Sequence, residues 1–133
     1  MTEFNIKKVK TVDFQGTLLR WSKGHNFPLN IGVLPETTFV YYVEDIPVYS
    51  VCFYNTDSYL AWLAWPLSNP FCDKLLKEGG LNRLFQYVSE YAKSLDYIFL
   101  FTTSSTIEIE DKLKEVSFIQ GDTKVNHYLK ILN

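Results

Sequence analysis

The feature that most constrains the fold is a strand-helix-strand pattern in the second half of the sequence. Residues 59–65 (YLAWLAW) and 97–102 (YIFLFT) are short apolar runs without a charged side chain, which is typical of strands covered on both faces. Between them, residues 80–95 carry apolar side chains at helical spacing: Leu81, Leu84, Phe85, Val88, Ala92 and Leu95. A helix between two such strands predicts a parallel crossover within one sheet.

The first half of the chain predicts an antiparallel meander. Residues 37–43 (TTFVYYV) and 48–54 (VYSVCFY) are dense in β-forming side chains, and the turn sequence 44–47 (EDIP) separates them. This pair reads as a hairpin, and residues 59–65 then form the third strand of the meander. Residues 4–9 alternate in polarity and predict a strand before it.

Two further helices and a last strand complete the expected order. A helix begins at residues 11–13, with Asp13 as N-cap, and ends near Gly24. Residues 106–116 predict another helix, and residues 125–132 predict a final strand. We therefore expect one α+β domain over residues 1–133, with a mixed sheet flanked by helices.

Composition narrows the function classes. The net charge is −2, which argues against a nucleic-acid binder. Aromatic residues make up 17% of the chain, which indicates either a bulky core or an aromatic pocket or partner surface. Cys52 and Cys72 have no metal-ligand spacing, so we expect two free thiols, no metal and a cytoplasmic location. The polar first residues, MTEFNIKKVK, predict no signal peptide, and no apolar run reaches membrane-spanning length.

The element order resembles the GCN5-related N-acetyltransferase (GNAT) fold. Residues 6–13 (IKKVKTVD) look like the family's first strand running into a helix. Residues 77–82 (KEGGLN) look like a degenerate acyl-CoA loop, whose usual pattern is Gln/Arg-x-x-Gly-x-Gly/Ala. Lys77 stands at the Gln/Arg position and Gly80 at the first Gly, but Asn82 replaces the second small residue.

Three other stretches are similar to a small GNAT-like group encoded by tailed bacteriophages: Leu34-Pro35-Glu36, Tyr54-x-Thr56-x-Ser58 and Trp65-x-x-Ser68-Asn69-Pro70. If the chain is phage-encoded, its location is the host cytoplasm. Ser117-Phe118 falls where the family carries Gly-Phe after its last helix.

The resemblance implies a binding site for acetyl-CoA or coenzyme A. Two central strands would splay apart near Trp65 and Thr102, and the pantetheine arm would lie between them. The diphosphate would meet the start of the following helix, where free N–H groups favour an anion. The residues implied at this site are Trp65, Leu67, Lys77, Gly79, Gly80, Asn82, Arg83, Thr102 and Ser104. Glu78 would place a negative charge beside the diphosphate.

The usual catalytic residues are missing. The strand over residues 59–65 has no carboxylate to act as base, and Leu113 stands where a proton-donating Tyr is usual. His127, Glu36 and Tyr54 are the substitute candidates, and each also has an ordinary structural explanation.

Two functions therefore remain open. The first is an acyl-CoA-dependent N-acyltransferase acting on an unknown amine, with weak activity or none. The second is a non-catalytic interaction module that binds a protein partner, such as a host protein. The resemblance implies a homodimer under either function, and we expect neither nucleic acid nor a membrane as partner.

Overall fold

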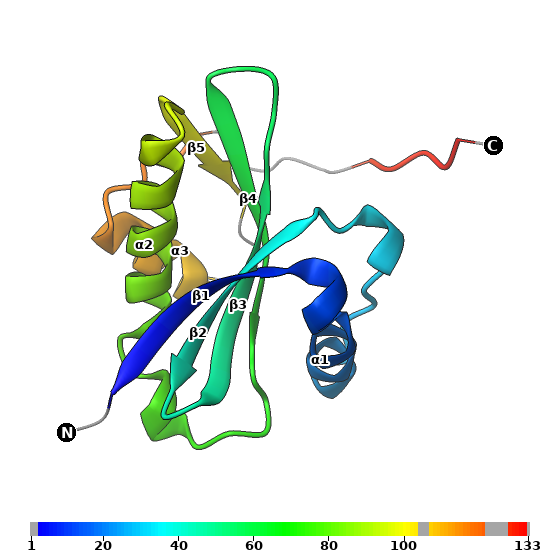
Figure 1. The fold of residues 1–133 in the computed structure, drawn as a ribbon, viewed down its shortest axis with the longest axis vertical. Coiled ribbons are helices and arrows are strands. Elements are labelled where there is room, and N and C mark those ends of the chain that lie inside the picture. The colour runs from blue at the N-terminus through cyan, green and yellow to red at the C-terminus, as the bar shows by residue number, and fades with distance from the viewer. Residues whose placement is uncertain (1–2, 104–106, 122–127, 133) are drawn as a thin grey trace.

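The structure is a computed structural model that describes residues 3–103, 107–121 and 128–132 (Figure 1). Its centre is a five-stranded mixed sheet in the order β1-β2-β3-β4-β5. The pairs β1–β2, β2–β3 and β3–β4 are antiparallel, and β4–β5 is parallel. The strands are β1 (Phe4–Lys10), β2 (Thr37–Val43), β3 (Ile46–Tyr54), β4 (Leu60–Ser68) and β5 (Phe99–Thr102).

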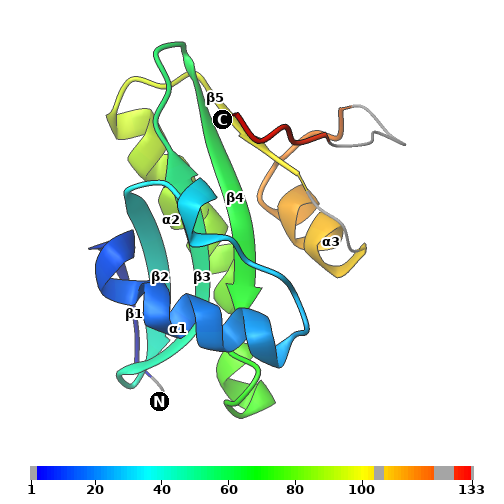
Figure 2. The ribbon, with the colours of Figure 1, turned by 90° about the vertical axis from the view of Figure 1, so that its right-hand side faces the viewer.

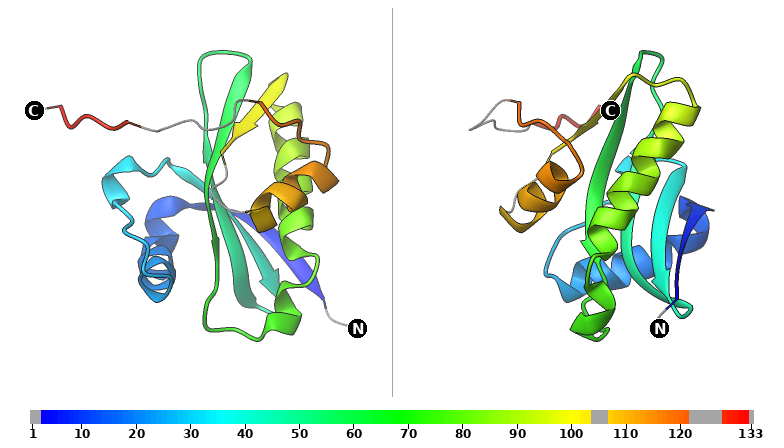
Figure 3. Two further views of the ribbon diagram at one scale, coloured as in Figure 1. Left: turned by 180° about the vertical axis from the view of Figure 1, so that it is seen from behind. Right: turned by 90° about the vertical axis from the view of Figure 1, so that its left-hand side faces the viewer.

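Helices cover both faces of the sheet. Helix α1 (Thr11–Gly24) lies on one face, as Figure 2 shows, and α2 (Gly80–Ser94) lies on the other, as Figure 3 shows. Helix α3 (Ile107–Glu115) is on the α2 side. Short 3-10 turns occupy Ile31–Val33 and Lys74–Lys77. The expected α+β class and the β4-α2-β5 crossover are confirmed.

Each face of the sheet has its own core. The larger core joins α2 and α3 to the sheet, and its helical members are Leu81, Leu84, Phe85, Val88, Ala92 and Leu113. The smaller core joins Phe14, Leu18 and Trp21 of α1 to Val40 and Leu67. The apolar spacing of α2 places these buried side chains on one stripe, as the sequence predicted, although Leu95 lies beyond the helix and is exposed.

Strand β4 is longer than the sequence indicated. A proline normally ends a central strand because it has no N–H to donate, so residues 59–65 were the expected limits. The strand instead continues through Pro66 to Ser68, because a bulge absorbs the proline: Ser50 pairs with Leu67 and Cys52 with Ala64. Trp65 has a φ of 56° at this bulge, a conformation that is costly for a bulky side chain.

Several local expectations needed correction. Asp13 is not the N-cap of α1: the cap is Lys10, and Asp13 lies in the first turn. The hairpin turn is shorter than expected, because Glu44 and Asp45 both adopt positive φ and β3 begins at Ile46.

The prediction that the last parallel strand is covered on both faces is wrong. Strand β5 lies at the sheet edge; Leu100 packs against the larger core, but Phe99 and Phe101 are 62% and 49% exposed.

The predicted final strand over residues 125–132 is also not supported. Residues 125–127 lie outside the described residues, and Tyr128–Leu132 form no strand. Leu129 and Ile131 are about four-fifths exposed (81% and 80%). Among the helices of the described residues, none combines the length and apolarity needed to cross a membrane.

Candidate functional site

The candidate site lies where β4 and β5 stop pairing. The parallel ladder runs from Leu60–Phe99 to Leu63–Thr102 and then ends, while β4 continues to Ser68. Over Ala64–Ser68, β4 pairs with β3 on one side, and no described strand pairs with its other edge. Backbone N–H and C=O groups along a free strand edge can hydrogen-bond an extended ligand.

The start of α2 is the second part of the site. Gly79 is the N-cap and has a φ of 70°, a left-handed conformation that favours glycine. The Arg83 N–H donates to the Gly79 carbonyl (3.2 Å), and no side chain of the described residues caps this end. The first N–H groups of a helix have no partner within it, so this end attracts an anion.

Gly80 has a packing role that its place in the motif did not reveal. A Cβ on Gly80 would lie 2.6 Å from Cε1 of the buried Tyr41 ring and 3.0 Å from the Tyr49 ring. A glycine is therefore required here for α2 to pack against the sheet, whether or not a ligand binds.

Arg83 is already engaged by the fold. Its Nη1 donates to the Tyr41 hydroxyl (2.8 Å), and its guanidinium carbon lies 4.5 Å from the centre of the Phe4 ring. This arrangement ties α2 to β1 and β2, so a diphosphate would have to draw Arg83 away from these partners. Lys77 ends the 3-10 turn before α2 and is half-buried.

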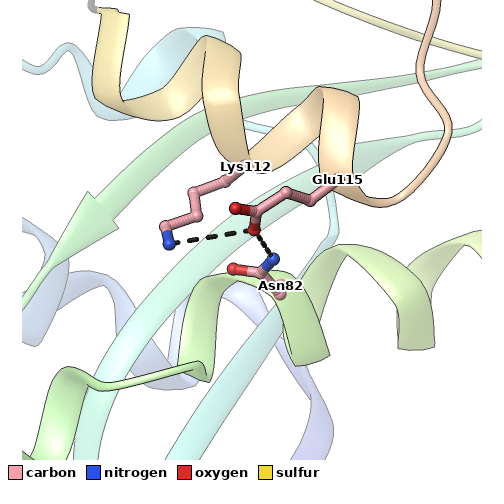
Figure 4. Close-up of polar contacts among 3 residues, drawn as sticks. All are labelled: Asn82, Lys112 and Glu115. Atoms are coloured by element: carbon pink, nitrogen blue, oxygen red, sulfur yellow. Dashed lines mark hydrogen bonds and ion pairs between the residues drawn. The ribbon is translucent and has the colours of Figure 1, made fainter.

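Asn82 contacts α3. Its side-chain amide donates to the Glu115 carboxylate, and Lys112 forms an ion pair with the same carboxylate (3.8 Å), as Figure 4 shows. The side-chain oxygen of Asn82, Oδ1, is buried and accepts no hydrogen bond from the described residues. A carboxylate that is ion-paired with Lys112 thus lies beside the first turn of α2. The sequence did not reveal this contact, because its partners are 33 residues apart.

Four rings beside the β4 bulge come from the loop after α1 and from strands β3 and β4. We call them the aromatic cluster: Phe27, Tyr54, Trp62 and Trp65. Tyr54 stacks on Trp62 with ring centres 4.8 Å apart, and Phe27 meets Trp65 edge-on at 6.1 Å. Trp65 Nε1 donates to the Tyr54 hydroxyl (2.7 Å), which in turn donates to the Val33 carbonyl (2.7 Å). The cluster therefore joins the loop after α1 to β3 and β4.

Tyr54 is held as a neutral phenol. Burial raises its pKa, and the hydrogen bond from Trp65 lowers it by less. Nearby, His25 Nε2 donates to the Ser68 carbonyl (2.9 Å), which attaches the start of the same loop to the end of β4. Tyr54 was a candidate from the sequence, whereas Phe27 was not, because nothing in its local pattern marks it as a neighbour of Trp65.

The remaining predicted residues are dispersed. Leu67 is buried in the core under α1, away from any ligand at the free edge of β4. Glu36 lines a shallow pocket of about 270 Å³ with Lys10, Gln15 and Leu34, beside the start of α1. Thr102 is the last paired residue of β5, and its hydroxyl donates to the Thr103 carbonyl (3.5 Å).

Two predicted residues, Ser104 and His127, lie outside the described residues. Leu113, at the position where a Tyr would be usual, is buried in the larger core.

The environment of Cys52 does not activate its thiol as a nucleophile. Cys52 and Cys72 are both free, and burial raises the pKa of the Cys52 thiol to about 11. Within the described part of the chain, no three His, Cys, Asp or Glu side chains gather closely enough to hold a metal ion.

The fold defined by this sheet, its crossover and its incomplete parallel pair is that of solved acetyltransferases. No protein-family model matches the sequence, and no curated protein is significantly similar to it. The relationship is therefore one of fold, at sequence identities too low to carry over residue roles.

Three solved structures illustrate it. An aminoglycoside acetyltransferase from an uncultured soil metagenomic sample has 13% identity and a TM-score of 0.74, with 97% of each chain covered. An aminoglycoside N-acetyltransferase in complex with CoA has 12% identity and a TM-score of 0.65, covering 98% of this chain and 96% of that one. A GNAT-family acetyltransferase from Streptococcus pneumoniae has 14% identity and a TM-score of 0.65, with 98% of each chain covered.

Proposed function

We propose that this protein is an acyl-CoA-dependent N-acyltransferase that transfers an acetyl group from acetyl-CoA to an amine. The proposal rests on two features that occur together in this fold. The edge of β4 over residues 64–68 is free, and the start of α2 has no side-chain cap. A pantetheine arm suits the first feature, and a diphosphate suits the second. A solved neighbour of the same fold was determined with CoA.

The backbone fits this ligand better than the side chains do. We assign the diphosphate to the N–H groups at Gly79 and Gly80, with Lys77, at the end of the preceding 3-10 turn, as the cation beside them. Trp65 and Thr102 flank the pantetheine, and Ser104 follows on the chain. Asn82 and Arg83 contribute only if their contacts to Glu115 and Tyr41 open, and Leu67 contributes through its backbone alone.

The transfer requires a neutral amine. The nitrogen lone pair forms the new N–C bond to the thioester carbonyl, and the C–S bond breaks with its electron pair leaving on sulfur. The proton lost by nitrogen passes to water or to the thiolate. Strand β4 carries no carboxylate to accept it, so Glu36, Tyr54 and His127 remain the proposed proton carriers. Of the two carriers that the structure describes, Tyr54 lies next to the bulge, and its hydroxyl would have to release the Val33 carbonyl before it could donate a proton to the departing thiolate.

Isothermal titration of the purified chain with acetyl-CoA tests the proposal. We expect a 1:1 complex that Lys77→Glu weakens several-fold, because the charge beside the diphosphate is reversed. Lys74→Glu is the matched control, since Lys74 begins the same 3-10 turn and is exposed. Absence of binding at high micromolar acetyl-CoA, or equal effects of the two variants, would overturn it.

A second candidate is a non-catalytic interaction module, which would act on a host protein if the chain is phage-encoded. Its support is the apolar surface at the β5 edge, where Ile98, Phe99 and Phe101 are about half to two-thirds exposed (66%, 62% and 49%). Light scattering after gel filtration would reveal a homodimer. If the dimer forms through the β5 edge, Phe99→Lys should convert it to a monomer. Both functions suit a reducing cytoplasm, because Cys52 and Cys72 are free.

A further inference from the structure

The aromatic cluster offers a ligand surface directly beside the point where β4 and β5 part. Trp62 is 37% exposed and Phe27 is 39% exposed, so ring surface remains open on both sides of the Tyr54–Trp65 hydrogen bond. Phe101 of β5 is the strand neighbour of Trp62 and is half exposed, which extends the aromatic surface onto β5. The last β4–β5 pair follows immediately, at Leu63 and Thr102.

The segments that carry this surface contain no carboxylate, Lys or Arg side chain. The loop over residues 25–35, β3, β4 and β5 have neither Asp, Glu, Lys nor Arg, and their one ionisable cation former, His25, is hydrogen-bonded to Ser68. A polycation such as a polyamine or an amino sugar needs carboxylates to pair with its ammonium groups. These segments supply none, whereas exposed ring faces stack on a flat apolar body.

We propose that the acceptor is a primary monoamine on an aromatic or flat apolar body, bound on Trp62, Tyr54 and Phe27. This inference rests on the proposed function and names its second substrate. The fixed hydrogen bonds from Trp65 to Tyr54 and from Tyr54 to Val33 orient the rings before the ligand arrives.

The uncharged surface also bears on the missing base. Transfer of an ammonium group from water to an apolar surface disfavours its charged form, so the amine loses its proton more easily when it is bound. Solvent can then accept the proton, and a carboxylate on β4 is not required.

Binding of amines without acyl-CoA tests the inference apart from catalysis. Saturation-transfer NMR and calorimetry on the full chain would compare 2-phenylethylamine with spermidine. We expect 2-phenylethylamine to bind about tenfold more tightly, Trp62→Ala to weaken it at least about fivefold and Trp62→Phe to retain most of the affinity. Tyr59→Ala is the matched control, because Tyr59 is an exposed ring next to β4 that has no ring contact with the cluster.

Tighter binding of spermidine, or equal effects of Trp62→Ala and Tyr59→Ala, would overturn the inference. A dimer that Trp62→Ala converts to monomer would also overturn it, since a protein would then cover the rings. Acetyl-CoA binding measured on the same samples separates the two proposals. Acetyl-CoA binding without selective amine binding leaves the proposed function standing and removes this inference. Selective amine binding without acetyl-CoA binding supports the amine surface but removes the proposed function, and with it the role of the amine as acceptor.

Discussion

The helix start over residues 79–83 and the aromatic cluster are two parts of the same candidate site. They differ in how many of their side chains already have partners within the protein. At the helix start, Gly80 packs on Tyr41, Arg83 donates to Tyr41, and Asn82 donates to Glu115. In the aromatic cluster, Trp62 and Phe27 keep more than a third of their surface open. The segment that looked most like a ligand motif in the sequence is thus one whose polar side chains, Asn82 and Arg83, are both already hydrogen-bonded within the fold.

This difference shows that packing alone can require a glycine within a ligand-like motif. Gly80 is needed for close contact between α2 and the sheet, and this need would persist in a chain that binds no coenzyme. What the helix start still offers a ligand is its backbone, whereas the cluster offers side-chain surface.

The largest effect is expected at Gly80. Gly80→Ala places a Cβ 2.6 Å from the Tyr41 ring, so α2 must shift, and we expect a loss of about 3 kcal/mol in unfolding free energy. Gly16→Ala in α1 is the control: its Cβ meets nothing within 4 Å, and it should stabilise the protein by about 0.5–1 kcal/mol. Chemical denaturation measures both. A neutral Gly80→Ala would mean that packing does not explain this glycine.

The next largest effect is expected at Cys52 of β3, which pairs with Ala64 beside the β4 bulge. Burial raises the pKa of the thiol from its ordinary value of 9.0 to about 11, so the folded state disfavours the thiolate. This contribution to stability is complete below pH 9 and is lost as the pH rises to about 11. Relative to Cys52→Ser, the protein should lose roughly 2 kcal/mol over this range. If the protein and Cys52→Ser lost unfolding free energy equally as the pH rises, the buried Cys52 thiol would not be the cause.

Tyr54→Phe tests the hydrogen bonds that hold the aromatic cluster. The variant keeps the ring stacked on Trp62 but leaves the Trp65 N–H and the Val33 carbonyl without their partner. We expect a loss of about 1 kcal/mol in unfolding free energy and weaker amine binding, with acetyl-CoA affinity unchanged. If Tyr54→Phe instead weakened acetyl-CoA binding and left amine binding unchanged, the aromatic cluster would belong to the acetyl-CoA site and not to the amine site.

The smallest effect is expected at Glu115. Glu115→Gln removes the negative charge beside the first turn of α2 but keeps an oxygen that can accept from Asn82. We expect acetyl-CoA affinity to rise about threefold, because less repulsion opposes the diphosphate. Asp111→Asn makes the same change of net charge elsewhere on α3. An equal rise in both variants would show that overall charge, rather than this contact, is responsible.

The regular parts of the fold were predictable because their patterns are local. The β2–β3 hairpin, the α2 stripe and the parallel crossover follow from the spacing of apolar side chains. The continuation of β4 past Pro66 was not predictable, because only the opposing strand reveals that a bulge absorbs the proline. The exposed rings of β5 were also missed, since an apolar run looks the same at a sheet edge as at its centre.

The candidate site was predictable only in outline. Its location followed from the resemblance, whereas its contacts depend on tertiary packing between distant segments. Arg83 and Tyr41 are 42 residues apart, and Asn82 and Glu115 are 33 apart. No local pattern could have indicated that these side chains are already occupied, or that Phe27 lies against Trp65.

Backbone amide NMR of the labelled chain titrated with coenzyme A tests the central claim most directly. Chemical-shift changes should gather at Gly79–Leu81 and at the free edge of β4 over Ala64–Leu67, and should spare β1 and β2. A titration that leaves both groups of amides unmoved, or that moves amides only elsewhere, would contradict the assignment of this site to an acyl-CoA.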